Sequence, residues 1–392
     1  MSVQENDKKY IANTYARFDV VLTHGKGALV YDEQEKEYID FTSGIGVNTL
    51  GFCEEGWMQA VETQLHKLTH VSNLYYSTPD VDVAKCLCER TGCKKVFFAN
   101  SGAEANEGAI KAARKYSHDK YGEGRSEIIT LVNSFHGRTI ATLSATGQEH
   151  FHEHFMPFTP GFVYAQANDF NDILAKVSDH TCAIMLEMVQ GEGGVIALDK
   201  KFVQQVATYC EEHDVLLIID EVQTGVGRTG TLYAYEQFAV HPDIVTSAKA
   251  LGGGLPIGAV LLYDKVEHTL RYGDHGTTFG GNPIACAGAA YILKTCDDAF
   301  LVEVQKRGVY LKEKLQQLPH VKEVSGMGLM LGVAFDAMSG REVVDACLAK
   351  GAIFLTAKAK LRLLPPLNIT YEQIDQGIAI LSEVLTNWEV KQ

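Results

Sequence analysis

The feature that most constrains the fold is a series of short apolar runs between residues 80 and 265, separated by amphipathic stretches. The runs lie at 96–99, 128–132, 162–165, 182–187, 215–220, 244–248 and 258–263. Several are almost continuously apolar, which is typical of strands buried on both faces. Stretches such as 104–118 and 201–213 have helical periodicity. This alternation predicts an α/β fold with a mainly parallel sheet, covered by helices, and functional loops at the carboxyl ends of the strands.

The two ends of the chain have a different pattern. Residues 10–50 contain extended segments and a turn. Residues 298–392 mix helices with short strands, with helices expected at 301–317 and 341–350 and strands at 329–335, 352–356 and 361–364. We expect both ends to form one smaller α+β region. The predicted division is therefore 1–50 and 291–392 for the small domain and 51–290 for the large domain.

Composition excludes several classes of protein. The chain has 392 residues, of which 46% are hydrophobic and 21% charged, as in folded globular proteins. Its formal charge of −14 argues against non-specific binding of nucleic acids or of anionic membranes. No apolar run is long enough to span a bilayer, and the N-terminus is too polar for a signal peptide. Nine scattered cysteines without a CxxC pair predict reduced thiols and a cytoplasmic location.

The segment Ser101-Gly102-Ala103-Glu104 directly follows the apolar run at 96–99 and opens a helix. Ser101 and Glu104 match a capping box. A strand followed by small residues and a helix N-terminus offers free N–H groups, which favours phosphate binding. An ordinary capped helix is the alternative.

Two charged residues stand at the ends of other apolar runs. Asp220 ends the run 215–220, where a buried carboxylate needs a partner, such as a cationic ring nitrogen or the backbone it caps. Lys249 follows the run 244–248 and precedes three glycines. Loss of solvation there would lower its pKa and make it a candidate Schiff-base nucleophile. The alternative is a lysine that reaches solvent from a loop.

Residues 225–230 match the GxGxxG pattern, but we reject a dinucleotide site. The glycines do not follow their strand directly, and no clear helix begins at Gly230. The chain has no GxxxxGK[ST] loop, and no spacing of His or Cys that suggests a metal site.

Several ordered motifs resemble those of the class III, pyridoxal-phosphate-dependent aminotransferases of fold type I. They are SGAEANEGAIKAAR, FHGRT, EMVQGEGG, DEVQTGVGRTG, SAKALGGGLPIGA, HGTTFGGNP and LRLLPPL, between Tyr15 and Leu367. The resemblance implies a mainly parallel seven-stranded sheet in a large domain, with a smaller α+β domain beside it. It also implies that pyridoxal 5'-phosphate is the cofactor.

The resemblance assigns coenzyme contacts to individual residues. Lys249 would hold the coenzyme covalently, and Asp220 would keep its pyridine nitrogen protonated. Gln223 would contact the ring hydroxyl, while Val222 and Phe135 would cover the two ring faces. The remaining coenzyme-binding residues implied are Ser101, Gly102, Ala103, Glu221 and Thr278. Of these, Gly102 and Ala103 would donate N–H groups to the phosphate, and Thr278 would reach it from a partner subunit, so that an obligate homodimer is expected.

The substrate residues implied by the resemblance include two arginines. Arg138 would bind a substrate carboxylate. Arg362 would pair with Glu192 until 2-oxoglutarate enters, because planar guanidinium groups suit dicarboxylates. Tyr15, Ile45 and Thr277 would line the pocket. Ornithine aminotransferases tend to carry Tyr at the position of Ile45, which favours an acetylated donor.

The activity implied is transfer of the distal amine of N2-acetyl-L-ornithine to 2-oxoglutarate. The products would be N-acetyl-L-glutamate 5-semialdehyde and L-glutamate, a step of arginine biosynthesis. Ornithine, succinylornithine, succinyldiaminopimelate and 4-aminobutyrate are alternative donors, and a decarboxylase or aminomutase is an alternative reaction type. A binding protein that has lost catalysis is the alternative of another class, against which the intact Lys249, Asp220, Gln223 and Thr278 argue.

Overall fold

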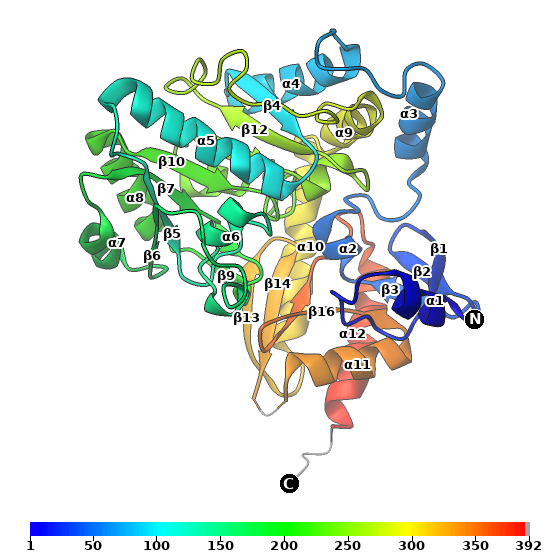
Figure 1. The fold of residues 1–392 in the computed structure, drawn as a ribbon. Coiled ribbons are helices and arrows are strands. Elements are labelled where there is room, and N and C mark those ends of the chain that lie inside the picture. Colours follow the sequence, from blue (N-terminus) through cyan, green and yellow to red (C-terminus); the bar gives the residue numbers. More distant parts are fainter. Residues whose placement is uncertain (337, 389–392) are drawn as a thin grey trace.

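The computed structural model describes residues 1–336 and 338–388 of the chain (Figure 1). Its centre is a seven-stranded sheet of order β4-β12-β11-β10-β7-β5-β6. The strands are β4 (Lys95–Ala99), β5 (Glu127–Leu131), β6 (Phe162–Ala165), β7 (Thr181–Leu186), β10 (Leu216–Asp220), β11 (Ile244–Ser247) and β12 (Gly258–Leu262). Only β12 is antiparallel to its neighbours. The predicted α/β class and mainly parallel sheet are therefore confirmed.

Helices cover both faces of this sheet. On the face of α5 lie Leu216 and Ile218, and on the face of α8 lie Leu217 and Ile219. This alternation explains why the strand sequences are continuously apolar. The helices of this part are α3 (Glu55–Leu65), α4 (Thr78–Thr91), α5 (Gly102–Tyr121), α6 (Ile140–Ala145), α7 (Phe170–Lys176), α8 (Lys200–His213) and α9 (Pro283–Thr295).

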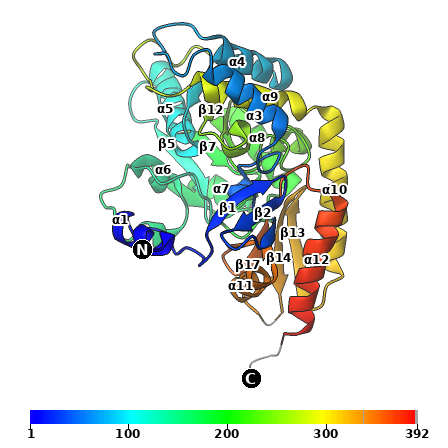
Figure 2. The ribbon, with the colours of Figure 1, turned by 90° about the vertical axis from the view of Figure 1, so that its right-hand side faces the viewer.

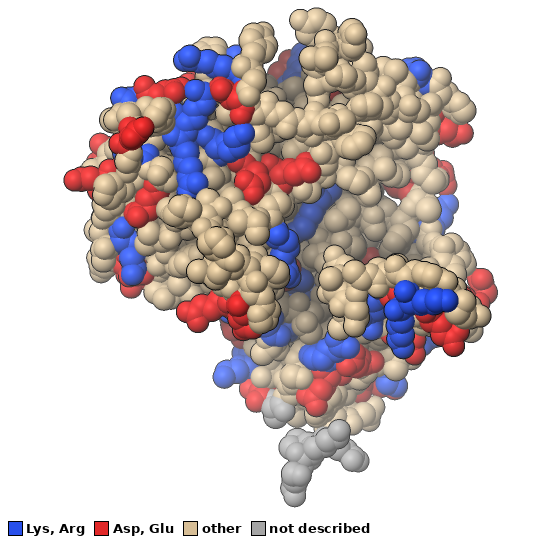
Figure 3. Space-filling model, viewed as in Figure 1, with Lys and Arg blue, Asp and Glu red and all other residues tan. Residues whose placement is uncertain are grey.

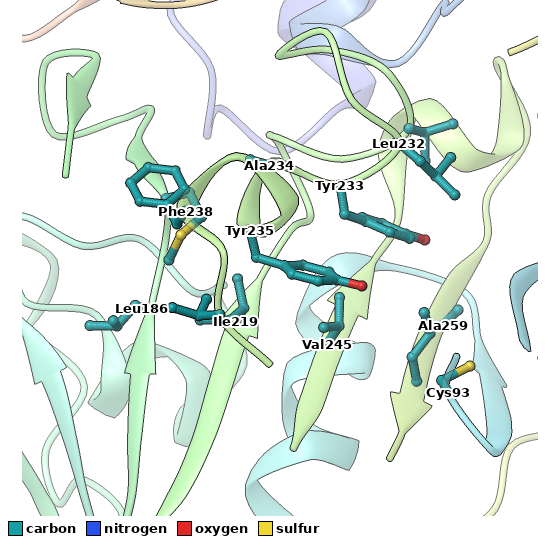
Figure 4. Packing of buried hydrophobic residues seen from close by; sticks show 14 of the residues in the cluster. Cys93, Leu186, Ile219, Leu232, Tyr233, Ala234, Tyr235, Phe238, Val245 and Ala259 are labelled. Atoms are coloured by element: carbon teal, nitrogen blue, oxygen red, sulfur yellow. The ribbon is translucent and has the colours of Figure 1, made fainter. Parts of the chain in front are cut away.

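The hydrophobic core between the large sheet and α8 also contains the aromatic segment after β10. Tyr233 and Tyr235 are stacked with ring centroids 6.2 Å apart, and both are buried. Figure 4 shows the ring of Tyr235 lying over Ile219 and Val245 of the neighbouring strands β10 and β11. The glycine-rich residues before them form turns and no helix begins at Gly230, as the sequence indicated. This segment therefore packs as core and opens no dinucleotide-type helix.

The two ends of the chain meet in a second body below the large sheet (Figures 1 and 2). The N-terminal strands β1 (Leu22–Lys26), β2 (Leu29–Asp32) and β3 (Glu37–Asp40) form a sheet with the C-terminal β15 (Ala352–Ile353). A further sheet has the order β13-β14-β17-β16, with β13 Val321–Met327, β14 Met330–Phe335, β16 Leu355–Ala357 and β17 Lys360–Leu363. One hydrophobic core joins Ile39 and Phe41 to C-terminal residues. We propose the domain division at residues 50 and 290 on this basis.

The remaining helices surround this second body. They are α1 (Val3–Tyr10), α2 (Ser43–Gly46), α10 (Asp298–Gln316), α11 (Gly340–Lys350) and α12 (Tyr371–Thr386). A short pair of strands, β8 (Val189–Gln190) and β9 (Ile196–Ala197), lies between β7 and α8 in the chain. Figure 2 shows α10 and α12 side by side along one edge. Within the described residues, no helix is both long and apolar enough to cross a lipid bilayer.

Candidate active site

The carboxyl ends of the parallel strands bring the predicted site residues to one edge of the large sheet. Asp220 is the last residue of β10, and Lys249 follows β11 after one residue. Ser101 comes two residues after β4, and Glu187 directly follows β7. Ligands of open α/β sheets bind at this edge, since the loops that follow the strands converge there.

Asp220 is 3% exposed and is held by three donors. The amide Nδ2 of Asn106 and the ring Nδ1 of His136 each lie 2.8 Å from its Oδ2. The backbone N–H of Val222 donates to its Oδ1 at 3.0 Å. These contacts satisfy the buried carboxylate and fix its orientation at the tip of the strand.

Lys249 begins a short 3₁₀ turn (η3, Lys249–Gly252) with a φ of 42°, an unusual backbone conformation for a non-glycine residue. Burial lowers the pKa of its amine, Arg362 lowers it further, and Glu192, Asp220 and Glu187 oppose the shift. The amine has no hydrogen bond or ion pair with any described residue. A lysine that is desolvated and unpaired is suited to covalent chemistry with a carbonyl group.

The helix α5 begins beside Asp220 and supplies the predicted phosphate site. The first N–H groups of a helix have no acceptor within it, so Gly102 and Ala103 point donors at this edge. A side chain at Gly102 would come within 2.5 Å of Cγ1 of Val222, so only glycine permits this close approach.

The predicted capping box at this helix is only half formed. The Ser101 hydroxyl accepts the N–H of Glu104 at 3.2 Å, as expected. The carboxylate of Glu104 does not return to the N–H of Ser101, and instead accepts the backbone N–H and the side-chain amide of Asn100, at 2.7 and 2.8 Å. Asn100 offers two donors where Ser101 offers one, which explains the difference.

Arg362 and Glu192 form the predicted ion pair. Nη1 of Arg362 lies 2.5 Å from Oε1 of Glu192 and 3.4 Å from Oε1 of Gln223. The side chain of Arg362 is 4% exposed and that of Glu192 is 31% exposed. Because one partner reaches solvent, the carboxylate can move away and leave the arginine available to another anion.

Phe135 and Arg138 lie on the loop after β5. The backbone N–H of Phe135 donates to Oε2 of Glu187 at 3.0 Å. Burial raises the pKa of Glu187 well above its ordinary value, and the charge of Asp220 adds to the shift. The guanidinium of Arg138 lies 4.1 Å from the ring centre of Phe151 and 5.6 Å from that of Phe135, and this arginine is exposed. It is therefore accessible to an incoming carboxylate.

Four other predicted residues lie toward the surface. Tyr15 is 70% exposed and Ile45 is 41% exposed. The hydroxyl of Thr277 accepts the side-chain amide of Asn100 at 3.1 Å, next to Ser101. Thr278 is exposed and has no hydrogen bond to another described residue. The chain does not by itself join Tyr15 or Thr278 to Lys249.

Sequence reasoning missed three residues that support the site: Asn106, His136 and Glu187. Each lies inside a motif quoted above, SGAEANEG, FHGRT or EMVQGEGG. The sequence carries no signal for these contacts, because His136 and Asn106 are 84 and 114 residues away from Asp220 along the chain and meet it only in the folded protein.

The residues present fit a phosphorylated pyridine aldehyde. The unpaired Lys249 would hold the aldehyde, the anchored carboxylate of Asp220 would suit a protonated ring nitrogen, and the start of α5 would offer N–H groups to the phosphate. Figure 3 shows a hollow in this face of the molecule, with Lys and Arg side chains inside it, although the chain as a whole has a formal charge of −14. This local field favours anionic substrates.

Comparison with known proteins gives the same class. The model of the family "Aminotransferase class-III" matches residues 10–385. The acetylornithine aminotransferase of Haemophilus ducreyi is 58% identical over 98% of both chains, and that of Methanocaldococcus jannaschii is 45% identical over 99% and 100%. An N-acetylornithine aminotransferase structure from Stenotrophomonas maltophilia has a TM-score of 0.85 at 36% identity, covering 97% of this chain and 98% of that one. An ornithine aminotransferase from Toxoplasma gondii has a TM-score of 0.93 at 32% identity, covering 98% and 94%.

The chain belongs to the class-III aminotransferases. It is thus an enzyme of fold type I that depends on pyridoxal 5'-phosphate, and the predicted family, fold class, enzyme class and cofactor are confirmed. Among its relatives, the acetylornithine aminotransferases match it along nearly the whole length.

Proposed function

We propose that this enzyme transfers the distal amine of N2-acetyl-L-ornithine to 2-oxoglutarate, forming N-acetyl-L-glutamate 5-semialdehyde and L-glutamate in arginine biosynthesis. The observation that carries the proposal is the difference between the two arginines at the site. Arg138 is exposed and free to bind the single carboxylate of the donor, while Glu192 neutralises Arg362. The acceptor has two carboxylates and needs both arginines, which the displacement of Glu192 would supply.

The side chains have distinct tasks in this proposal. The coenzyme, when bound, draws electrons from the substrate carbon whose C–H bond breaks. Asp220, held by Asn106 and His136, provides the fixed negative charge that keeps the pyridine nitrogen protonated. Lys249 anchors the coenzyme, and its amine moves the proton at that carbon once the substrate amine has replaced it.

The remaining residues confine the coenzyme. Phe135, whose backbone is fixed by Glu187, covers one ring face and Val222 the other. Ser101, Gly102 and Ala103 surround the phosphate.

Other coenzyme and substrate contacts complete the proposal. Gln223 contacts the ring hydroxyl. Glu221 stabilises the loop after β10, because its carboxylate accepts the backbone N–H of Tyr235 at 2.8 Å. Thr277 and Tyr15 line the substrate pocket.

We further propose that the working form is a homodimer in the cytoplasm, with Thr278 of each subunit completing the phosphate site of the other. Large exposed apolar side chains support this, because they gather in two segments close to Thr278. In 65–76 they are Leu65, Leu68, Leu74, Tyr75 and Tyr76, and in 272–279 they are Tyr272 and Phe279. Asn73 joins the two segments by donating to the carbonyls of Thr277 and Gly280 at 3.2 and 3.0 Å.

The proposal is tested by comparing donors in single-turnover reactions of the holoenzyme. Acetylornithine, ornithine, succinylornithine, succinyldiaminopimelate and 4-aminobutyrate are each mixed with enzyme, and kcat/KM is ranked. We expect acetylornithine to rank first, because Ile45, which is 41% exposed and which we propose to line the pocket, offers an apolar surface to its acyl group. A higher kcat/KM for ornithine or 4-aminobutyrate would contradict the proposal.

A further inference from the structure

A strained turn lies at the edge of the proposed substrate pocket. Four consecutive residues, Ser43 to Gly46 (α2), have positive φ angles of 42°, 64°, 65° and 75°. Two of these residues are not glycine, and a β-branched residue such as Ile45 rarely adopts this conformation. Such strain persists only where the surroundings fix the backbone, and it gathers at functional sites.

Hydrogen bonds from buried groups hold this turn. The hydroxyl of Ser43 is fully buried, donates to the carbonyl of Leu364 at 2.5 Å, and lies 3.3 Å from Nη2 of Arg228. Within the turn, the N–H groups of Gly46 and Val47 donate to the carbonyls of Thr42 and Ser43, at 2.9 and 2.8 Å. Ser43 therefore connects the strained turn to the chain that follows β17.

Arg228 is the centre of this network. It is 0% exposed, and its Nη1 donates to the carbonyls of Pro365 and Leu329, at 2.5 and 3.2 Å. Its own carbonyl accepts the N–H of Leu329 at 3.0 Å. Burial lowers the pKa of Arg228, and the charge of the buried Asp40 opposes this shift. Burying a charged group among carbonyls is costly, so we look for what Arg228 holds in place.

We propose that Arg228 is a positioning residue of the substrate pocket. Through Ser43 it fixes the turn that carries Ile45, and through Pro365 it fixes the end of the strand that carries Arg362. One guanidinium thus sets the spacing between the donor side and the acceptor side of the pocket. The inference rests on the proposed function in that Ile45 and Arg362 are taken to face substrates.

Two variants of the holoenzyme test this assignment, with a matched control. Arg228→Lys keeps the charge and removes the planar fork, and Ser43→Ala removes one hydroxyl. Arg90→Lys is the control, because Arg90 also donates to two backbone carbonyls, of Leu293 and Cys296, at 2.7 and 2.8 Å, but these lie at the end of α9 and not at residues 43–48 or 363–367.

We expect Arg228→Lys to lower kcat/KM by about tenfold or more in both half-reactions, since small misplacements of binding groups are costly. For Ser43→Ala, we expect the acetylornithine-to-ornithine ratio of kcat/KM to change about fivefold, with the glutamate half-reaction within about twofold of wild type. Hydrogen exchange should rise at residues 43–48 in both variants, and at 363–367 in Arg228→Lys, but in neither segment of Arg90→Lys.

Unchanged exchange at 43–48, or an unchanged donor ratio in folded Ser43→Ala that still binds coenzyme, would overturn the inference. An equal rise of exchange over the whole chain of Arg228→Lys would also overturn it, because this indicates a general loss of stability. If Arg228→Lys does not fold, Ser43→Ala alone decides. Failure of the proposed function is distinguishable, because wild-type enzyme would then leave acetylornithine unreacted while the exchange experiment still reports on the turn.

Discussion

At the scale of single residues, the site depends on groups that are either satisfied or deliberately left without a partner. Asp220 has three donors, whereas the amine of Lys249 has no acceptor among the described residues. A hydrogen-bonded carboxylate keeps one orientation, and an unpaired amine keeps its lone pair accessible as burial lowers its pKa. These opposite environments suit the opposite tasks that we propose for the two groups.

Replacing Lys249 by Ala should abolish turnover, because the change removes both the anchor and the group that moves the proton. Borohydride treatment followed by peptide mass spectrometry should find the coenzyme attached at residue 249 in wild type and nowhere in the variant. Lys265→Ala is the control, since Lys265 pairs with Asp243 at 3.5 Å away from the site and should behave as wild type. Steady-state transamination by Lys249→Ala would refute the role of this residue.

Glu221 should make the stability of the protein depend on pH. Burial raises its pKa from 4.5 to about 7. The folded state then binds more protons than the unfolded state between these values, so stability is fully present below pH 4.5 and falls as pH rises toward 7. The loss amounts to about 3 kcal/mol. Glu221→Gln resembles the protonated acid, and its Tm should fall less than that of wild type between about pH 5 and pH 8.

The control for this measurement is Glu123→Gln, a change of an exposed carboxylate. Its Tm should follow wild type across the same range. Parallel Tm curves for wild type and Glu221→Gln would show that Glu221 does not carry this pH dependence.

At the scale of elements, strand positions were predictable and strand direction was not. The expected run 162–165 coincides with β6, and the run 215–220 contains β10, because buried strands leave continuous apolar runs between polar loops. A continuous apolar run is compatible with either strand direction, so the sequence does not indicate that β12 is antiparallel. Helices α3, α4 and α9 were not predicted, although their apolar periodicity is comparable to that of the predicted α10.

The site followed the same rule. Lys249, Asp220 and the start of α5 could be proposed from the sequence because each lies within three residues of the carboxyl end of a strand. His136 and Asn106 could not be assigned, since their role comes from a contact with Asp220 that only the folded sheet creates. The second half of the capping box failed for a similar reason, as a neighbouring residue offered better donors.

The strand β17 carries the proposed switch between the two substrates. Arg362→Ala should impair mainly the half-reaction with glutamate and 2-oxoglutarate. The fall in kcat/KM should correspond to a loss of about 2–4 kcal/mol of transition-state stabilisation, because the buried cation that binds a substrate carboxylate is removed. The half-reaction with acetylornithine should change little, since Arg138 binds that carboxylate. Single-turnover rates of both halves provide the measurement.

Arg138→Ala should weaken both half-reactions, because the donor carboxylate is proposed to bind Arg138 and the acceptor is proposed to need both arginines. Equal damage to both half-reactions by Arg362→Ala would mean that Arg362 and Glu192 do not act as a switch.

At the scale of the whole molecule, the exposed apolar segments near Thr278 should be buried between two subunits. Leu74 is 88% exposed and Tyr76 is fully exposed. The double change Leu74→Asp with Tyr76→Asp should convert a particle of about twice 43.0 kDa into one of single-chain mass, with loss of bound coenzyme. Light scattering after gel filtration measures the mass, and coenzyme absorbance measures the occupancy.

Val309→Asp is the control, because Val309 is 58% exposed on α10, outside these segments. It should retain the mass and coenzyme content of wild type. A wild-type particle of single-chain mass would contradict the homodimer.

The pairing of β3 with β15 has a consequence for how the chain is made. These strands are neighbours in a parallel ladder, although Ile39 and its partner Ala352 are separated by roughly 300 residues. A ribosome therefore releases the first strands long before their neighbour exists, and the seven-stranded sheet emerges in between. A polypeptide cut short by a premature stop codon before residue 352 would keep β3 as an open strand edge, because its neighbour β15 would be missing.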